Sequence, residues 1–145
     1  MKKYKFELFA KRTKEATDLD GTIETTYDAA TFCRQFYFDD INIFESFFVV
    51  LMKNKSVVGW AKIAQGGVAS TTVDVKIIAK YAIDTLCTSV ILCHNHPSGD
   101  LKPSILDKQL TKQIKAALEL FNIRVSDHII ITENDYFSFQ ANGLL

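Results

Sequence analysis

The stretch SVILCHNHPSGDLKPSILD, residues 89–107, decides the expected fold. It opens with the short apolar run Ser89–Cys93, which is typical of a central strand that is buried on both faces. A loop with two prolines follows, and Ser104 then starts a helix that we expect to reach about Phe121. The stretch therefore predicts a strand, a polar loop and a helix, with the loop leaving the end of a buried strand.

The sequence on either side alternates between helical and strand patterns. Apolar spacing predicts helices over 26–38, 73–86 and 104–121, and apolar or alternating runs predict strands over 44–52, 57–64, 89–93, 123–131 and 136–139. On the predicted helices, the apolar positions expected to face inward are Ala29, Phe32, Cys33, Phe36, Val75, Ile78, Ala79, Ala82, Ile83, Leu86, Leu106, Leu110, Ile114, Ala117, Leu118 and Phe121. This order predicts a mixed α/β (α+β) domain, in which about three helices flank one mixed sheet.

Length and composition fit one domain. The chain has 145 residues, and 48% of them are hydrophobic, so it can bury a proper core. Residues 1–26 are the most polar part and are expected to form an N-terminal extension, with room for an edge hairpin, before a domain over 27–145. No apolar run approaches the roughly 18 residues of a membrane span, and no signal peptide is recognisable, so a cytoplasmic protein without membrane contact is expected.

Charge and cysteine content narrow the class further. The 17 basic residues balance the 17 acidic ones, which disfavours strong non-specific binding to nucleic acid, although a local basic patch stays possible. Cys33, Cys87 and Cys93 are an odd number, are widely spaced and form no C-x-x-C pair. They are expected to be free buried thiols.

The loop after the buried strand carries a pattern of metal ligands. His94 and His96 are two residues apart, so on an extended chain both rings project to the same side. Asp107, in the first turn of the next helix, can supply a third ligand. Three nitrogen and oxygen ligands with an open position are typical of a catalytic zinc site, whereas a structural site normally recruits cysteine. Cys93 should point to the other face of the strand.

Each part of this pattern can also arise without a metal. An isolated H-x-H can be a pair of surface histidines, and Ser104 with Asp107 also forms the Ser-x-x-Asp pattern of a helix capping box. Two of the three histidines with a correctly spaced carboxylate favour metal binding. Glu45, between Phe44 and Phe47-Phe48, is the candidate proton acceptor, because an apolar setting raises a carboxyl pKa. The alternative for Glu45 is a solvent-facing position on an edge strand.

These residues resemble the JAMM motif of the JAB/MPN metalloprotease superfamily. The string Glu45, His94-x-His96, Ser104 and Asp107 has the spacing of that motif, and His-Asn-His-Pro-Ser-Gly-Asp is similar to the bacterial RadC-like branch. Further matches are Glu45-Ser46-Phe47, Val73-Asp74, Asp127-His128 and Tyr136-Phe137-Ser138-Phe139. The resemblance covers about residues 27–145 and implies a single JAB/MPN-like domain with a layout like that of cytidine deaminases.

The resemblance also implies chemistry. It implies a zinc ion (Zn²⁺) bound by His94, His96 and Asp107, with Glu45 as general base and Ser104 as a hydrogen-bond donor to the oxyanion. Asp127 and His128 match family positions of unassigned role, either structural or in support of the metal ligands or the substrate. The expected activity is hydrolysis of a peptide or isopeptide bond in an unidentified peptide or protein conjugate.

Two other classes of protein can be compared with this expectation. A cytidine deaminase would need His-x-Glu and Pro-Cys-x-x-Cys, which this chain lacks, and the letters His-Asn-His do not have the spacing of an HNH nuclease. The alternative function is a RadC-like module associated with DNA repair, or one that binds without catalysis. Longer RadC-like proteins carry a helix-hairpin-helix region associated with DNA binding, for which this sequence has no room. The intact motif favours the hydrolase.

Overall fold

A computed structural model describes residues 5, 11, 21–37, 40–66 and 72–145. The elements in chain order are α1 (Thr26–Arg34), β1 (Ser46–Lys53), β2 (Ser56–Gln65), α2 (Val75–Asp84), β3 (Ser89–Asn95), α3 (Ile105–Glu119), β4 (Arg124–Ile131) and β5 (Tyr136–Ser138). The five strands form one sheet in the order β2-β1-β3-β4-β5. Only β3 and β4 pair in parallel, and the other neighbours are antiparallel. The predicted mixed α/β domain with three helices is confirmed.

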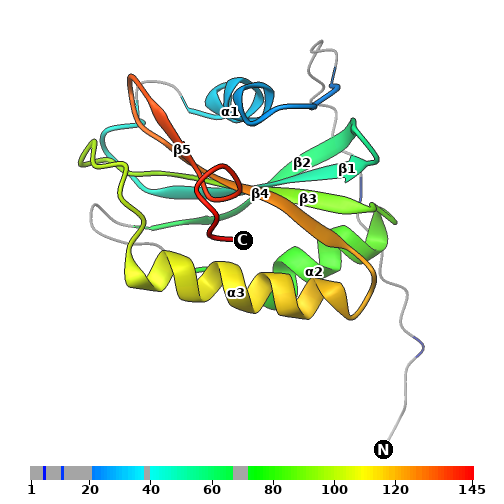
Figure 1. Cartoon of the computed structure of the whole chain (residues 1–145). Coiled ribbons are helices and arrows are strands. Elements are labelled where there is room, and N and C mark those ends of the chain that lie inside the picture. Colours follow the sequence, from blue (N-terminus) through cyan, green and yellow to red (C-terminus); the bar gives the residue numbers. More distant parts are fainter. Residues whose placement is uncertain (1–4, 6–10, 12–20, 38–39, 67–71) are drawn as a thin grey trace, which may run out of the picture.

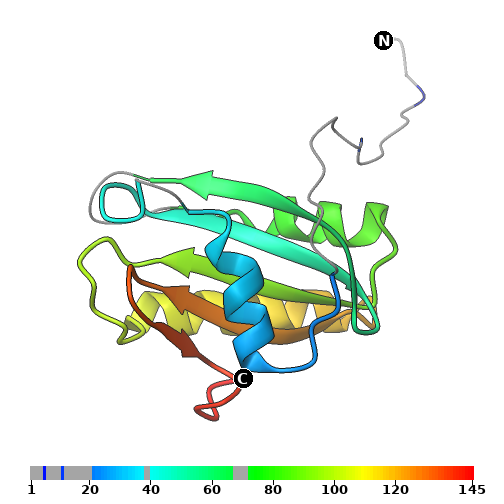
Figure 2. The same cartoon turned by 90° about the horizontal axis from the view of Figure 1, so that it is seen from above.

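The sheet lies between two layers of helix. Figure 1 shows α1 on one face and α2 with α3 on the other, and Figure 2 shows the same layers from above. The burial pattern follows this arrangement, because β1 and β3 are buried on both faces while the outer strand β2 is partly exposed. Ile91 and Cys93 pack towards α1, whereas Val90 and Leu92 pack towards α2 and α3. Alternate residues of β3 therefore face different layers.

Several details of the helices differ from the prediction. The helix predicted over 26–38 ends at Arg34, and residues 38 and 39 lie outside the described residues. Its apolar pattern continues because Phe36, in the following turn, stacks on Phe48 with ring centroids 4.7 Å apart. Arg34 donates hydrogen bonds to main-chain oxygens around Thr132, which fixes this end of α1 against the turn after β4.

The inward face predicted for the other two helices is wrong at their ends. Ile83, Leu86, Leu106 and Phe121 are exposed, and Ile83 is in the last turn of α2. Leu86 and Phe121 lie beyond the last helical residues, where the chain turns away, and Leu106 is in the first turn of α3. The buried residues of α3 are Thr111, Ile114 and Leu118, so the prediction is confirmed for Ile114 and Leu118, and Thr111 was not predicted.

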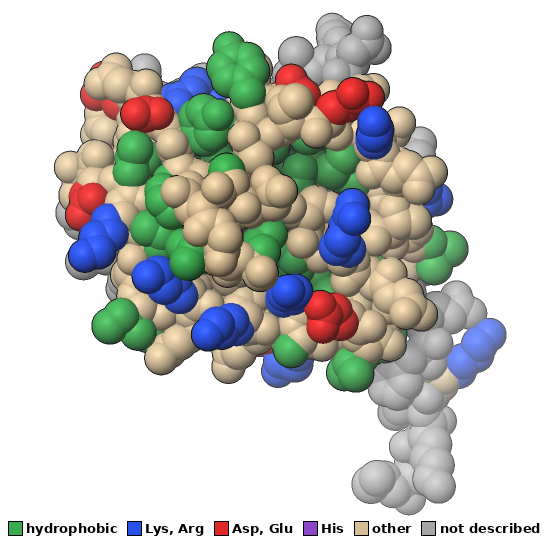
Figure 3. Space-filling model, in the orientation of Figure 1, with side chains coloured by type: hydrophobic (Ala, Val, Ile, Leu, Met, Phe, Trp, Pro, Cys, Tyr) green, Lys and Arg blue, Asp and Glu red, His purple; other side chains and the backbone are tan. Residues whose placement is uncertain are grey.

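Four further observations concern the N-terminal part, the surface and the cysteines. Thr22 forms an isolated bridge with Ser56, so residue 22 lies at the outer edge of β2, and most of the predicted N-terminal hairpin lies outside the described residues. Figure 3 shows basic side chains along the edge formed by α3, which carries Lys108, Lys112 and Lys115.

Among the described residues, no helix has the length and hydropathy needed to cross a membrane. The cysteines are free and buried, as predicted.

Candidate metal centre

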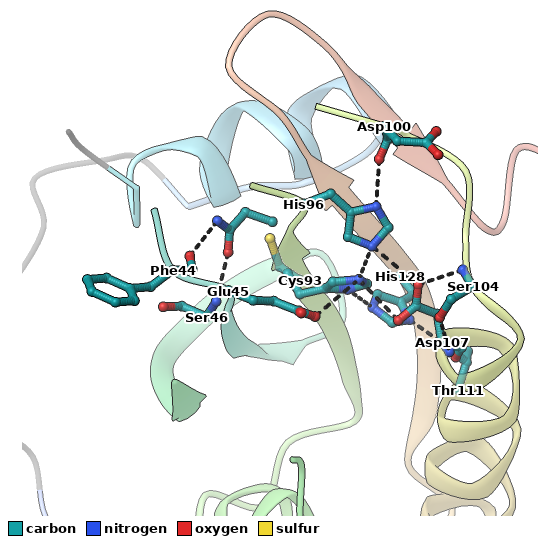
Figure 4. A network of polar contacts seen from close by, with 12 residues as sticks. Phe44, Glu45, Ser46, Cys93, His96, Asp100, Ser104, Asp107, Thr111 and His128 are labelled. Carbon is teal, nitrogen blue, oxygen red and sulfur yellow. Dashed lines mark hydrogen bonds and ion pairs between the residues drawn. The ribbon is translucent and has the colours of Figure 1, made fainter. Parts of the chain in front are cut away.

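Three side chains converge at the end of β3, where the chain turns towards α3 (Figure 4). The Nε2 atoms of His94 and His96 are 3.0 Å apart. The Asp107 carboxylate lies 3.3 Å from each ring, through Oδ1 to His94 Nε2 and through Oδ2 to His96 Nε2. Within the part of the chain that the structure describes, these three residues are the cluster that could bind a metal ion.

The helix cap holds Asp107 in this position. Ser104 is the N-cap of α3, and its Oγ accepts a hydrogen bond of 3.0 Å from the Asp107 N–H. In return, Asp107 Oδ2 accepts one of 2.8 Å from the Ser104 N–H. Both halves of a capping box are therefore present. The sequence offered helix capping and metal binding as alternatives for Asp107. In the structure, the same Asp107 carboxylate takes part in the cap and contacts both histidines.

A chain of buried hydrogen bonds fixes the ring of His94. Thr111 Oγ1 donates to the Asp107 main-chain oxygen at 2.7 Å, which uses its single proton. Thr111 Oγ1 must then accept from His128 Nδ1–H, also at 2.7 Å. Burial first, and the nearby charge of His94 second, hold the pKa of His128 well below its usual value, so this ring is neutral and its Nε2 is an acceptor. It accepts from His94 Nδ1–H at 2.8 Å. This bond leaves Nε2, which faces the cluster, as the nitrogen of His94 that can bind a metal.

The ring of His96 is fixed by the loop that follows it. His96 Nδ1–H donates to the main-chain oxygen of Asp100 at 2.6 Å, so Nε2 is the ring nitrogen that faces the cluster. Burial acts to lower the pKa of His96, but its hydrogen bonds to Asp107 and Asp100 outweigh burial and raise this pKa. The loop reaches back through a turn, in which the Gly99 N–H donates to the His96 oxygen at 3.0 Å. Gly99 has a φ of +83°, in the left-handed region that glycine tolerates best.

This donor set fits a metal ion. The Nε2 atoms of His94 and His96 lie 3.0 Å apart, and an ion bound between them and Asp107 would take the place of any proton that they share. Burial acts to raise the pKa of Asp107, but its contacts with the two histidines lower it well below the usual range, so the third donor is anionic. A tetrahedral ion with bonds of about 2.0–2.1 Å would require ligand atoms about 3.3–3.4 Å apart, close to the spacing observed. All three side chains could therefore bind a single cation.

Glu45 lies beside this cluster. β1 and β3 pair antiparallel with Phe47 opposite His94, so the residue two positions before Phe47 faces the same side of the sheet as both histidines. Glu45 Oε1 is 4.0 Å from His94 Nε2, and the side chain is 14% exposed. Burial is the largest influence on this group and raises the pKa of Glu45. Glu45 therefore faces the cluster, and the alternative of a solvent-facing position on an edge strand does not hold.

Asn95, between the two histidines, faces the other way and holds the segment that carries Glu45. Its side chain is fully buried. Asn95 Nδ2 donates to the main-chain oxygens of Ile41 and Phe44 at 2.7 and 2.8 Å, and Oδ1 accepts from the Ser46 N–H at 2.7 Å. The peptides on both sides of Glu45 are therefore bound to one amide. Sequence reasoning missed this role, because a buried asparagine has no signature in a sequence.

Asp127 and His128 have separate surroundings. The His128 ring is buried between Thr111 and His94 and stacks on Phe139 at 4.6 Å, so it belongs to the cluster. The Asp127 carboxylate is on the opposite face of β4, where it accepts hydrogen bonds from the Ser138 hydroxyl and the Gln140 N–H at 2.7 and 3.0 Å. Its contacts hold the C-terminal turn. Thr111, which sequence reasoning also missed, links α3 to His128.

Fold and cluster together define a small mixed α/β domain with a possible His–His–Asp metal site. The family model described as RadC-like JAB domain matches residues 23–144, and this chain belongs to that family. The resemblance inferred from the motif is confirmed.

Curated relatives agree with this assignment. The chain is 46% identical over 101 residues to a UPF0758 protein of Flavobacterium johnsoniae, a match that covers 69% of this chain and 44% of the relative. It is 41% identical over 99 residues to a UPF0758 protein of Porphyromonas gingivalis, with 66% and 44% covered. The UPF0758 protein YfjY of Escherichia coli K12 is 37% identical over 101 residues, with 70% and 63% covered. The chain therefore spans less than half the length of the first two relatives.

Proposed function

We propose that this chain is a zinc-dependent hydrolase that cleaves peptide or isopeptide bonds. One observation carries the proposal: two imidazole Nε2 atoms and the Asp107 carboxylate converge, and a fourth group, Glu45, lies 4.0 Å from His94 Nε2. The class of bond comes from the family resemblance, since the JAB/MPN superfamily includes metalloproteases.

Zinc is the metal that this donor set favours. Two imidazoles and one carboxylate are typical ligands of catalytic zinc, with a further position left for water or substrate. When bound there, zinc would lower the pKa of a water molecule towards about 7 and polarise a carbonyl oxygen. His94 and His96 turn their Nε2 atoms towards the cluster, because each Nδ1–H is donated to a group outside it.

Glu45 acts as the proton acceptor in this proposal. Its carboxylate is close to the ligands but farther from His94 Nε2 than Asp107 is, at 4.0 Å against 3.3 Å, which suits a group that contacts a water molecule without binding the metal. The raised pKa of Glu45 improves its match to proton transfer near neutral pH. It takes a proton from the attacking water and returns it to the departing amine.

Ser104 can stabilise the carbonyl oxygen that becomes negative. Its oxygen accepts from the Asp107 N–H, while its own proton has no acceptor among the described residues. That proton is therefore free to be donated to an oxyanion beside the cluster. Capping uses a lone pair of the Ser104 oxygen, and donation to an oxyanion uses its proton, so the two roles are compatible.

Metal content tests the ligand assignment. We expect about one zinc per chain, and nearly complete loss of zinc in Asp107→Asn. Asparagine keeps a side-chain oxygen that can accept the hydrogen bond from the Ser104 N–H, so this change should preserve the capping box while it removes the anionic ligand. Asp100→Asn is the matched control, because Asp100 contacts His96 through its main-chain oxygen only. Equal zinc content in all three proteins, by elemental analysis, would refute the ligand set.

The rate of hydrolysis tests the role of Glu45. Glu45→Gln keeps shape and hydrogen bonding but removes the proton acceptor, so it should retain zinc and lose about 100-fold to 10,000-fold in kcat. A panel of peptide and isopeptide conjugates provides the substrates. A Glu45→Gln protein that hydrolyses any of them at the wild-type rate would exclude Glu45 as the base.

A further inference from the structure

A groove with apolar walls opens beside the candidate metal centre. Its volume is about 260 Å³, and it lies between the first turns of α3, the start of β1 and the residues before α2. Its apolar wall consists of Phe47, Val73, Leu106 and Leu110, and Glu45 and Asp107 also line it. We call it the apolar groove.

The side chain of Leu106 is unusual for its position. It is 71% exposed in the first turn of α3 and lines the rim of the groove instead of packing in the core. Leu110, one helical turn later, is only partly buried against the core. Exposed leucines are common singly, but an apolar wall that lines a concavity is typical of a binding site.

The charges of the groove limit what it can bind. Among the described lining residues, the only charged groups are Glu45 and Asp107, and the others are apolar or neutral. Both carboxylates belong to the proposed reaction centre, so neither is left to pair with a basic side chain. An acidic side chain would face them both. The lining therefore suits a neutral, apolar group.

We infer that the apolar groove is a specificity site, which receives a neutral apolar side chain of the substrate directly beside the bond that is cleaved. This inference rests on the proposed hydrolase function, because the groove gains this meaning from its contact with Glu45 and Asp107. It narrows the substrate class to peptides or conjugates with an aliphatic or aromatic residue next to the cleaved amide.

Metal-binding hydroxamates separate the groove from the metal site. Two compounds carry an isobutyl group, on opposite sides of the chelating unit: N-acetylleucine hydroxamate and 2-isobutylsuccinic monohydroxamate. Their parents without the isobutyl group are N-acetylglycine hydroxamate and succinic monohydroxamate. On the zinc-loaded full chain, calorimetry should show that at least one isobutyl compound binds about tenfold or more tightly than its parent, the gain expected for burying a leucine side chain.

Matched variants locate the gain. Leu106→Ser should remove most of the isobutyl advantage, whereas Leu120→Ser should retain it, because Leu120 is 82% exposed at the far end of the same helix. Both leucines are exposed, so neither change should disturb the fold. The hydroxamates of N-acetylglutamate and Nα-acetyllysine should bind no more tightly than the glycine parent.

Each other outcome overturns a defined statement. If the parents bind but neither isobutyl compound gains, or if Leu106→Ser and Leu120→Ser behave alike, the groove is not a specificity site and the metal centre stands. If the charged analogues bind as tightly as the leucine compound, the apolar substrate class is wrong. If the parents do not bind the zinc-loaded chain at all, the hydrolase proposal fails, and the groove proposal fails with it.

Discussion

The two histidines of the cluster are held in different ways. His94 is 1% exposed, and its ring is fixed by His128 and Thr111, which come from β4 and α3. His96 is 16% exposed, and its ring is fixed by the main-chain oxygen of Asp100, four residues along the same loop. We call these the interior arm and the loop arm.

The difference shows which part of the site depends on the same contacts as the stability of the fold. The interior arm joins three elements through groups that have no access to water, so a lost hydrogen bond there leaves a buried polar atom unsatisfied. The loop arm depends on one turn at the surface, where water can replace a lost partner. Damage to the interior arm should lower stability and metal affinity together, whereas damage to the loop arm should lower metal affinity alone.

The largest effect should come from His128→Phe. The aromatic ring can keep its packing against Phe139, but the acceptor for His94 Nδ1–H is lost. We expect zinc affinity to fall by about 10-fold to 100-fold, as for other groups that orient a metal-bound histidine. The unfolding free energy of the zinc-free protein should fall by about 1–3 kcal/mol. Chelator competition and denaturant unfolding measure the two quantities.

Arg124→Ala, an exposed change in the same strand, is the control for His128→Phe. If both variants bind zinc like the wild type, His128 has no part in orienting His94.

A smaller effect is expected from Thr111→Val, which removes one hydroxyl with little change of shape. His128 Nδ1–H then has no acceptor, and the protonation pattern of the interior arm is no longer fixed. Zinc affinity should fall by up to about 10-fold, and stability by about 1–3 kcal/mol. Thr111→Ser should restore both, since serine keeps the hydroxyl. Equal losses in the valine and serine variants would mean that packing, not the hydrogen bond, is what Thr111 provides.

The smallest effect should follow Gly99→Ala in the loop arm. An added Cβ meets no atom within 4 Å, so its only cost is the positive φ, about 1–2 kcal/mol for an L-residue. The surface turn can open to escape this cost, so zinc affinity should fall a few-fold, while the unfolding free energy of the zinc-free protein should fall by less than it does in His128→Phe. Gly59→Ala, also with open space around its Cβ, is the control. A loss of stability as large as that of His128→Phe would remove the distinction between the two arms.

Much of the fold was predictable because it depends on local patterns. The buried run before His94 and the Ser104–Asp107 capping box both follow from neighbouring residues, and the structure has each of them. The three residues that could bind metal were likewise found from their spacing, since the strand and the helix start are both encoded in one short stretch.

The parts that escaped prediction depend on partners far apart in the sequence. Thr111 occupies the buried face of α3, where apolar spacing had placed Leu110 and Leu106, because its hydroxyl bonds to His128, 17 residues later. A polar residue with a distant partner looks like a surface residue in a sequence. The apolar pattern of α1 likewise continued past Arg34, because Phe36 packs on a strand from within a turn.

The amide of Asn95 has a consequence for how this family can vary. It ties the segment around Glu45 to the strand that carries the two histidines, through contacts with residues about 50 positions away. The distance between Glu45 and the histidines is thus set across one pair of strands, not along the chain between them. Insertions in the β1–β2 turn or before α2 should therefore be tolerated, while a single residue gained or lost between Ile41 and Ser46 would shift Glu45 out of register. Sequence length should vary freely in the first two places and stay fixed in the last.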